Sequence, residues 1–379
     1  MIIAHVLAAI FWICVGLLVY THAGYPLLLA ALSRIRRTGE APYNPVRGHT
    51  PLSGMPVSLV IAAYNEGAVI GRKIQNARAL EYSGDLEIIV ASDGSTDDTV
   101  AKAKAAGVDC VLELPRGGKI RAQDAAVARA RGEIVAFSDA NSFWESDALE
   151  RLVAPFADPE VGYVCGQVRF TNEAGDNQEG LYWRYELWIR GMESRLAGVT
   201  GGNGAIYAVR KEAYIQVDPR MGHDLSFPFN MAKRGWKPIY APGARAEEKM
   251  VPSIEGEFRR KRRMQSHMWP IVVHGGLLGL RGYSPLYALE IYSHRVLRYL
   301  TPLLHLVAFG ANIALLDDGA VYIATFAAQC ALLLGALVPA GPLRIARYYV
   351  AMTAAIGIAF FDWLRTGTPA GWEQAEGTR

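Results

Sequence analysis

Charged and amide side chains follow the apolar runs in the first half of the chain, each at the point where a run ends. They are, in chain order, Asn65, Glu66, Asp93, Lys119, Asp139 and Asn141. Carboxylates with a lysine suit a diphosphate held together with a hard divalent cation, because Mg²⁺ and Mn²⁺ take oxygen ligands and share them with phosphates. A nearby helix N-terminus would stabilise the negative charge further. The alternative is that Asn65, Gly94 and Ser95 are ordinary turn and cap residues and that Lys119 is a solvated loop lysine.

The elements that carry these residues alternate between strand and helix patterns. Residues 57–63 form a nearly continuous apolar run, which is typical of a strand buried on both faces. Further strands are predicted at 86–91, 109–114, 133–138 and 238–242. Ser95, with Asp98 three residues on, predicts the start of one of the intervening helices. Alternating strands and helices imply a mostly parallel sheet whose ligands bind outside the carboxyl ends of the strands, so we expect the polar residues to converge on one edge.

Length and composition narrow the class of protein. The 379 residues are enough for a sizeable core, and the net charge of +3 gives no reason to expect a nucleic-acid partner. The cysteines Cys14, Cys110, Cys165 and Cys330 are isolated, which predicts neither a disulfide framework nor a zinc site. Hydrophobic residues make up 51% of the chain and gather at both ends. This distribution indicates membrane segments at the ends and an enzyme-like domain in the middle.

Three motifs resemble, in the same order, those of family 2 glycosyltransferases with the GT-A fold. They are Val-Ile-Ala-Ala-Tyr-Asn-Glu at 60–66, Ser-Asp-Gly-Ser-Thr-Asp at 92–97 and Asp-Ala-Asn at 139–141. The resemblance implies a Rossmann-like α/β domain that binds a nucleoside-diphosphate sugar, with Mg²⁺ or Mn²⁺ as cofactor. It assigns nucleotide-sugar binding to Ala63, Tyr64, Glu66, Asp93, Lys119, Asp139 and Arg260. The implied metal ligands are Asp139 and Asn141, although the family has an acid at the position of Asn141.

The resemblance extends to the acceptor side of the reaction. Residues 200–210 are similar to the family's glycine-rich loop. This similarity implies acceptor-side roles for Gly202, Asn203 and Gly204. The family has an acidic pair at the start of the next helix, matched here by His223 and Asp224. Asp224 is thereby the implied general base, which must lie within hydrogen-bond reach of the acceptor hydroxyl, whereas helix capping is its alternative role.

A basic run at 257–264 stands where processive members of the family have a Gln-x-x-Arg-Trp motif. The matching residues are Arg260, Arg263 and Met264. Arginine binds phosphate oxygens bidentately, so Arg263 is the expected ligand of the leaving diphosphate, with Met264 on the acceptor side. In polymer synthases the tryptophan supports the acceptor sugar, so Met264 weakens the case for a processive enzyme. A polybasic stripe against anionic lipid is the competing interpretation.

Apolar segments at both ends are long enough to cross a bilayer. Residues 2–32 lack a basic start and a clear cleavage site, which favours a retained anchor over a signal peptide. The basic segment at 33–37 places the following domain in the cytoplasm by the positive-inside rule. Further candidate spans are 300–316, 319–338 and 348–363.

Four crossings would put both ends of the chain on the outer side. The tail from Trp372 to Arg379 is nevertheless similar to a cytoplasmic tail motif of the family. We therefore expect the last apolar segment to be interfacial or re-entrant. The expected organisation is an anchor at 1–37, a linker at 38–56, a cytoplasmic GT-A domain at 57–266, interfacial helices at 267–299, and transmembrane helices with the tail at 300–379.

The predicted function is metal-assisted, inverting transfer of a sugar to a hydroxyl acceptor by a multi-pass enzyme of the cell membrane, with a UDP-sugar as the expected donor. Two products remain open. One is a polysaccharide of the hyaluronan or poly-N-acetylglucosamine type, extruded by a processive synthase. The other is a single sugar on a lipid-linked or glycan acceptor. An alternative from a different class is an inactive membrane scaffold that binds nucleotide sugars.

Overall fold

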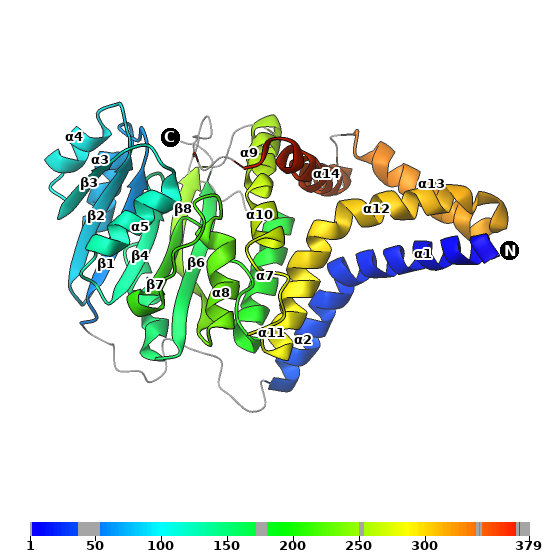
Figure 1. The fold of residues 1–379 in the computed structure, drawn as a ribbon, viewed down its shortest axis with the longest axis horizontal. Helices are drawn as coiled ribbons and strands as arrows, with labels where there is room; N and C mark the ends of the chain where they lie inside the picture. The colour runs from blue at the N-terminus through cyan, green and yellow to red at the C-terminus, as the bar shows by residue number, and fades with distance from the viewer. Residues whose placement is uncertain are drawn as a thin grey trace.

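The computed structural model describes residues 2–36, 54–171, 180–249, 254–338, 341, 343–368 and 371. An α/β domain occupies one end of the molecule, and long helices extend from it at the other end (Figure 1). Most of the predicted linker at 38–56 and the tail from Trp372 onward lie outside the described residues.

The α/β domain is built on an eight-stranded sheet with the strand order β3-β2-β1-β4-β7-β6-β8-β5. The strands are β1 (Val57–Ala63), β2 (Leu86–Asp93), β3 (Cys110–Leu114), β4 (Ile134–Asp139), β5 (Phe143–Trp144), β6 (Val161–Thr171), β7 (Ile206–Arg210) and β8 (Lys237–Lys249). β1 pairs in parallel with β2 and β4, and β3 lies parallel beside β2. β7 is antiparallel to β4 and β6, and β5 is antiparallel to β8. The prediction of a mostly parallel α/β sheet is confirmed, with antiparallel pairs confined to its second half.

The central strand β1 shows why a continuous apolar run is needed there. Successive side chains of a strand point to opposite faces of the sheet. Leu59 and Ile61 are fully buried in a core that includes residues of α3 (Ile70–Arg78), and Val60 is fully buried in a second core that includes residues of α5 (Lys119–Arg129). Helices cover both faces, so both faces of β1 are predominantly apolar.

Two elements differ from the sequence prediction. The helix expected to start at Ser95 is α4 (Thr99–Ala105), because the Asp97 carboxylate accepts a hydrogen bond from the N–H of Thr99 at 3.0 Å and so marks a later start. The strand expected at 238–242 continues to Lys249, because β8 pairs with β6 as far as Thr171. The longer strand carries Glu247 and Glu248 near its end, close to the candidate site described below.

The remaining helices of the α/β domain lie between its strands or follow its last strand. They are α6 (Ala148–Val153), α7 (Leu181–Leu196), α8 (His223–Lys233), α9 (Ile254–Ser266) and α10 (Met268–Val273). The apolar end of the molecule consists of α1 (Ile2–Val19), α2 (Tyr25–Arg36), α11 (Pro285–Glu290), α12 (Leu297–Ala314), α13 (Ala320–Gly335) and α14 (Leu343–Thr366). Two π-helical turns, η1 (Tyr20–Gly24) and η4 (Ile291–Val296), join α1 to α2 and α11 to α12.

Three helical stretches are long and apolar enough to cross a membrane among the residues that the structure describes. They are Ile2–Ile35, Pro285–Ala314 and Leu343–Thr366, and Ala320–Gly335 is a shorter apolar helix. The predicted boundary between interfacial helices at 267–299 and membrane helices from 300 therefore falls inside one continuous helix.

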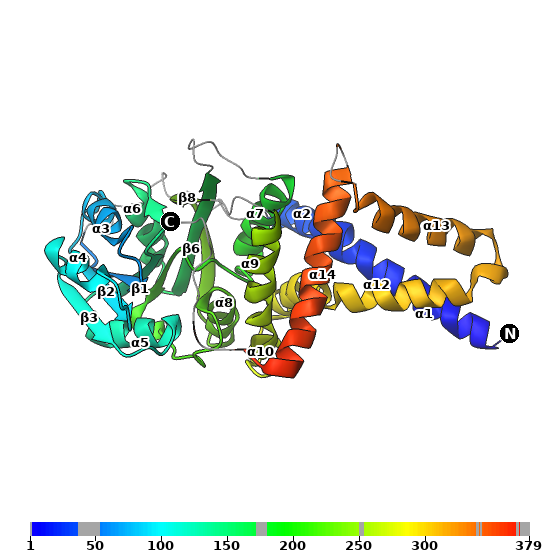
Figure 2. The same cartoon turned by 90° about the horizontal axis from the view of Figure 1, so that it is seen from above.

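The apolar helices differ in direction. α1, α12 and α13 extend away from the sheet, whereas α14 lies across them beside α9 (Figures 1 and 2). α1 packs on α12 through Phe11, Ala308 and Ala311. Their outer faces carry exposed apolar side chains: Ile2 is 82% exposed and Leu306 is 68% exposed. Apolar surface of this extent on a helix is suited to contact with lipid.

Candidate active site

The loops that follow β1 and β2 are hydrogen-bonded to each other at the carboxyl edge of the sheet. Ser95 accepts a hydrogen bond from the N–H of Asn65 at 3.0 Å, and Thr99 accepts one from the N–H of Glu66 at 2.7 Å. Asn65 has a φ of 52°, in the left-handed region that asparagine tolerates. Ala63 and Glu66 are buried beside this turn. Asn65 and Ser95 therefore shape the edge, as the turn interpretation predicts.

Asp93, at the end of β2, organises the loop that precedes α5. Its carboxylate accepts hydrogen bonds from the N–H groups of Gly117 at 2.7 Å and Gly118 at 3.0 Å, and it forms an ion pair with Arg116 at 2.7 Å. The guanidinium of Arg116 lies 3.4 Å from the ring centroid of Tyr64. A cavity of about 190 Å³ opens beside Asp93 and Arg116. A buried carboxylate beside a flat cation–π pair offers both a hydrogen-bond acceptor and a stacking surface to a nucleobase.

Lys119 and Asp139 meet across the same edge. Lys119 is the first residue of α5 and Asp139 is the last residue of β4. The Lys119 ammonium forms an ion pair with Asp139 and lies 3.5 Å from the carbonyl oxygen of Gly204, and the two charged side chains are only 15% and 25% exposed. A Cβ at position 204 would lie 3.3 Å from Lys119 Nζ, so the glycine permits this close approach. Lys119 is therefore a largely buried member of the site and not a solvated loop lysine.

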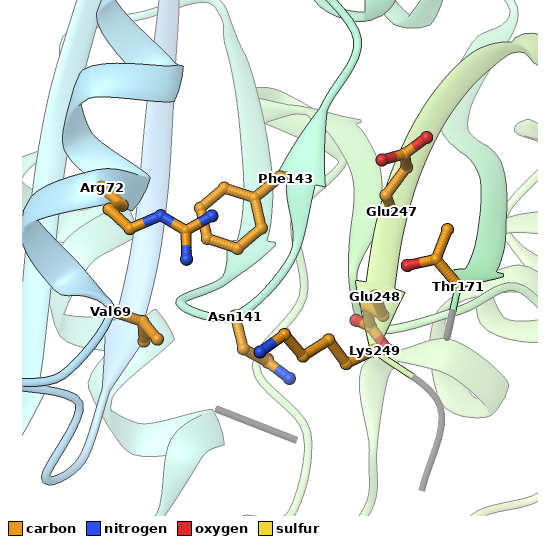
Figure 3. Close-up of a pocket in the computed structure, with 8 residues that line it drawn as sticks. All are labelled: Val69, Arg72, Asn141, Phe143, Thr171, Glu247, Glu248 and Lys249. Atoms are coloured by element: carbon orange, nitrogen blue, oxygen red, sulfur yellow. The ribbon is translucent and has the colours of Figure 1, made fainter. Parts of the chain in front are cut away.

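Asn141 lines a second cavity of about 190 Å³ (Figure 3). Glu247 and Glu248 of β8 and Arg72 of α3 also line it. The oxygens of Asn141, Glu247 and Glu248 are the hard ligands that Mg²⁺ and Mn²⁺ prefer, whereas Arg72 and Lys249 bring positive charge to the same cavity. Within the described ranges, no group of three or more His, Cys, Asp or Glu side chains is placed to hold a metal by itself. An ion at Asp139 and Asn141 would therefore take further ligands from the phosphates of a bound nucleotide.

Lys73 of α3 is a site residue that the sequence analysis missed. It is fully buried, and its Nζ donates a hydrogen bond to the carbonyl oxygen of Ser142 at 2.6 Å. Burial lowers the pKa of Lys73 to about 7, against the opposing effect of the nearby Asp139 and Glu248 carboxylates. The available signal was a lysine immediately before Ile74 on the buried face of the helix. Lys73 braces the turn after Asp139 from inside the protein.

The glycine-rich loop lies against the start of α8. The N–H of Gly202 donates a hydrogen bond to the carbonyl oxygen of Asp224 at 2.6 Å. The Asn203 side chain is turned into the protein: it donates to the carbonyl oxygen of Gly166 at 2.7 Å and accepts from the N–H of Ile206 at 2.8 Å. Asn203 therefore maintains the shape of the loop, so the loop can present only its backbone and glycines to an acceptor.

His223 and Asp224 have different surroundings. Asp224 is the second residue of α8, whose N-cap position is a glycine, so helix capping is not its role. His223 is 3% exposed, its Nδ1 lies 2.8 Å from the Tyr207 hydroxyl, and its ring stacks on Phe227 at 3.9 Å between centroids. Burial, with a smaller effect from the charge of Lys119, lowers the pKa of His223 to about 3. The imidazole of His223 is therefore neutral near pH 7. Of the two residues that match the family's acidic pair, only Asp224 can carry a negative charge.

Tyr207 and His267 are both influenced by the charge of Asp224. Burial is the main reason that the pKa of Tyr207 is raised far above its usual range, and Asp139 and Asp224 both add to the increase. His267, which follows α9, has a pKa lowered mainly by burial, with Asp224 raising it and Arg263 lowering it. Tyr207 therefore lies near both carboxylates, and His267 lies near both Asp224 and Arg263.

The basic run of α9 is divided between different contacts. Arg260 lies with its guanidinium 5.5 Å from the ring centroid of Phe170. Arg262 forms a two-point ion pair with Asp362 of α14, at 2.5 and 2.7 Å. Met264 is 37% exposed and places no aromatic ring at this position. Arg262 therefore joins α14 to the α/β domain, whereas Arg260 of the same basic run contacts Phe170.

Comparison with known proteins agrees with this architecture. Residues 58–217 match the family described as Glycosyl transferase family 2. The chain is 31% identical over 214 residues to a beta-monoglucosyldiacylglycerol synthase of Synechocystis sp., a match that spans 52% of this chain and 42% of that protein. It is 32% identical over 131 residues to an N-acetylglucosaminyltransferase of Rhizobium leguminosarum bv. trifolii, across 32% of this chain and 72% of that protein.

Among solved structures, the mannosyltransferase PcManGT of Pyrobaculum calidifontis, in complex with GDP-Man and Mn²⁺, has the same fold. The TM-score is 0.71 at 23% identity, and the match covers 94% of this chain and 99% of that one. The predicted GT-A fold is thus confirmed over the α/β domain and the helices attached to it. The chain therefore belongs to glycosyl transferase family 2, and its α/β domain has the GT-A fold.

Proposed function

We propose that the enzyme transfers one sugar, with inversion, from a nucleoside-diphosphate sugar to a hydroxyl of a lipid-linked acceptor at the cytoplasmic surface of the cell membrane. The observation that carries the proposal is that α8, the helix of Asp224, shares a hydrophobic core with the helices on the membrane side. Leu225 and Phe229 of α8 share a core with Ile271 of α10 and Tyr299 of α12. A base in this position is suited to an acceptor that comes from the bilayer.

The donor would lie along the carboxyl edge of the sheet. Asp93 and the Tyr64–Arg116 pair would hold the nucleoside at the cavity beside them. Lys119, beside Asp139, would face the diphosphate. This arrangement uses the first four strand ends for the donor and leaves the glycine-rich loop and α8 for the acceptor.

The transfer itself would be a single displacement. Asp224 takes the proton of the acceptor hydroxyl while that oxygen bonds to the anomeric carbon of the sugar. The bond from this carbon to the diphosphate breaks, and the nucleoside diphosphate leaves with the electron pair, so the configuration inverts. Lys119 and Arg263 offset the charge that develops on the leaving group, with Arg260 further along the same helix. Mg²⁺ or Mn²⁺, held by Asp139 and Asn141, would add charge stabilisation at the diphosphate when bound.

In the proposed membrane arrangement α1, α12 and α13 cross the bilayer and α14 lies along its surface. α14 runs across α12 and the N-terminal helix, with α13 to one side of it (Figure 2), and this transverse direction suits an interfacial position. Just after α14, Thr368 donates a hydrogen bond to the carbonyl oxygen of Ser266 at 2.8 Å, and a Cβ on Gly371 would lie 3.9 Å from Arg116. The chain therefore returns to the α/β domain after α14. Three crossings would put the N-terminus outside and this domain in the cytoplasm, which agrees with the expectation that the last apolar segment is interfacial or re-entrant.

Transfer of one sugar is favoured over extrusion of a polymer. α1 and α12 pack closely through the apolar side chains of Phe11, Cys14, Ala308 and Ala311. Met264 lacks the aromatic surface that polymer synthases of the family place at this position. The relative named beta-monoglucosyldiacylglycerol synthase supports a lipid acceptor. The relative named N-acetylglucosaminyltransferase supports the alternative of a polymer, which the experiment below separates.

The test uses the full-length protein in lipid nanodiscs. UDP-glucose, UDP-N-acetylglucosamine and GDP-mannose are each supplied with Mg²⁺ or Mn²⁺ and with diacylglycerol in the nanodisc. Release of nucleoside diphosphate and the size of the labelled product are recorded. We expect turnover with one donor, a product one sugar larger than the acceptor, and loss of turnover in Asp224→Asn. A ladder of long products would instead establish the polymer synthase, and absence of turnover with every donor would support the inactive scaffold.

A further inference from the structure

A buried cluster of polar and charged side chains lies where the membrane-side helices meet the α/β domain. Glu193 of α7 is fully buried, and its carboxylate accepts hydrogen bonds from Tyr25 of α2 at 2.7 Å and from Thr200 at 3.0 Å. The Nδ1 atom of His294 in η4 lies 2.6 Å from the same carboxylate. The Glu193 carboxylate thus connects α2, η4 and the glycine-rich loop.

Both membrane helices bend at this level. η1 and η4 are π-helical turns, which are rare and are frequently found at functional sites. The hydroxyl groups of Tyr20 in η1 and Ser293 in η4 are 2.9 Å apart, so the two turns are joined to each other. Figure 1 shows α1 and α12 leaving the α/β domain in the same direction beyond these turns. The cluster is therefore placed where a change in the membrane helices would reach the domain.

Thr200 connects this cluster to the glycine-rich loop. Its hydroxyl, fully buried, accepts a hydrogen bond from Arg295 Nε at 3.0 Å, lies 3.2 Å from His294 Nδ1 and donates to Glu193. The next residue, Gly201, packs directly under the Arg295 guanidinium, where a Cβ would overlap with it. The first two residues of the loop are thus held by side chains of η4 and α7.

The next residue of the loop contacts the start of α8. Gly202 donates its N–H to the carbonyl oxygen of Asp224 at 2.6 Å, and its own carbonyl oxygen accepts from Arg190 at 3.2 Å. A loop made largely of glycine has little intrinsic rigidity, so contacts from outside set its shape. Thr200 is two residues from the hydrogen bond to Asp224. Thr200 is therefore connected, through Gly201 and Gly202, to the backbone of the proposed general base.

We propose that Glu193, Thr200, His294 and Arg295 are positioning residues for glycosyl transfer, which hold the glycine-rich loop and through it Asp224 against the acceptor. The inference rests on the proposed role of Asp224 and extends it to residues that touch neither donor nor acceptor. At the nucleoside end of the donor site, Asp93 bonds to Gly117, Gly118 and Arg116, which are not members of the cluster. Loss of the cluster should therefore impair transfer while donor binding is retained.

The test compares Thr200→Val with Thr200→Ser in the full-length protein in nanodiscs, under the donor and diacylglycerol conditions given above. Valine removes the hydroxyl that joins Glu193 to Arg295, and serine keeps it. The matched control is Thr301→Val on α12, because Thr301 is 2% exposed and its hydroxyl bonds to the carbonyl oxygen of Leu297 in its own helix. Binding of UDP and of GDP with Mn²⁺ is measured by calorimetry, and hydrogen exchange is followed at 199–205 and 222–226.

We expect Thr200→Val to lower kcat by tenfold or more, to change nucleotide affinity by less than twofold, and to speed exchange in both segments. Thr200→Ser and Thr301→Val should stay within twofold of the natural chain in each measurement. Transfer at the natural rate by Thr200→Val, an equal loss in Thr301→Val, or a parallel loss of nucleotide affinity would overturn the proposal. If the natural chain shows no turnover with any donor, the proposed function fails by itself, and unchanged exchange at 222–226 in Thr200→Val would then refute the positioning role independently.

Discussion

The buried imidazole of His223 should make the folded protein sensitive to acid. Above pH 7 the side chain is neutral in both the folded and the unfolded chain, so it contributes no pH dependence there. Below pH 6.5 the unfolded chain takes up a proton at His223, whereas the folded chain does not, because its pKa there is about 3. The unfolded state then binds more protons, so the free energy of unfolding decreases as the pH falls from 6.5 towards 3.

The size of this effect follows from the shift. Each pH unit between the two pKa values costs about 1.4 kcal/mol, so a drop to pH 5 removes about 2 kcal/mol of stability through His223 alone. The Tyr207 hydroxyl faces Nδ1, the Phe227 ring covers the imidazole, and the charge of Lys119 disfavours protonation. The lowered pKa of His223 therefore has its main physical cause in burial, with a smaller contribution from the positive charge of Lys119.

The assay is denaturant unfolding of the full-length protein in detergent at pH 8, 6.5 and 5, for the natural chain and for His223→Gln. The variant loses the stacking on Phe227 and starts from a lower stability, so the comparison is of pH slopes. We expect the natural chain to lose about 2 kcal/mol more than His223→Gln between pH 8 and 5. His274→Gln, which changes an exposed histidine, is the control and should keep the natural slope. Equal slopes for the natural chain and His223→Gln would refute the buried, neutral imidazole.

Three further predictions concern the reaction. Asp224→Asn should lower kcat by roughly 10²–10⁴-fold with little change in donor KM, since it removes a general base and keeps the shape of the side chain. The value of kcat is measured from the release of nucleoside diphosphate, and a kcat equal to that of the natural chain would contradict the assignment. Arg116→Gln should raise donor KM about tenfold, because it removes the cation on Tyr64 and the ion pair with Asp93, and calorimetry with UDP or GDP provides the check. Asn141→Asp should tighten Mn²⁺ binding about tenfold by adding a carboxylate to the donor set, as measured by electron paramagnetic resonance without substrate; unchanged affinity would place the ion away from this side chain.

Much of the donor half could be predicted from local sequence. The apolar run of β1 and the polar residues after it follow from period-two burial and from the rule that parallel strands present their carboxyl ends on one edge. Asp93, Lys119 and Asp139 do lie at strand or helix ends of that edge. The turn conformation of Asn65 was also open to prediction, because asparagine tolerates a positive φ. Its hydrogen bond to Ser95 was not, because the two residues are 30 positions apart.

Other features depended on contacts between distant parts of the chain. Lys73 looks like a surface lysine until the turn at Ser142 is packed over it, and Asn203 looks like a ligand until its amide is bonded to Gly166. The full length of β8 follows from its pairing with β6, since a strand continues as far as its partner offers hydrogen bonds. Hydropathy could not separate a spanning α14 from one that lies across the other helices, because both orientations need an apolar helix of similar length.

The sequence by itself determined the alternation of buried strands and helices, the polar residues at strand ends and the apolar character of both termini. Each of these features depends only on residues that are close together in the sequence. Only the tertiary structure determined that Tyr25, Glu193 and His294 meet in one buried cluster beside the glycine-rich loop. These residues are far apart along the chain, and a buried carboxylate is stable there only because the folded chain brings its hydrogen-bond donors together.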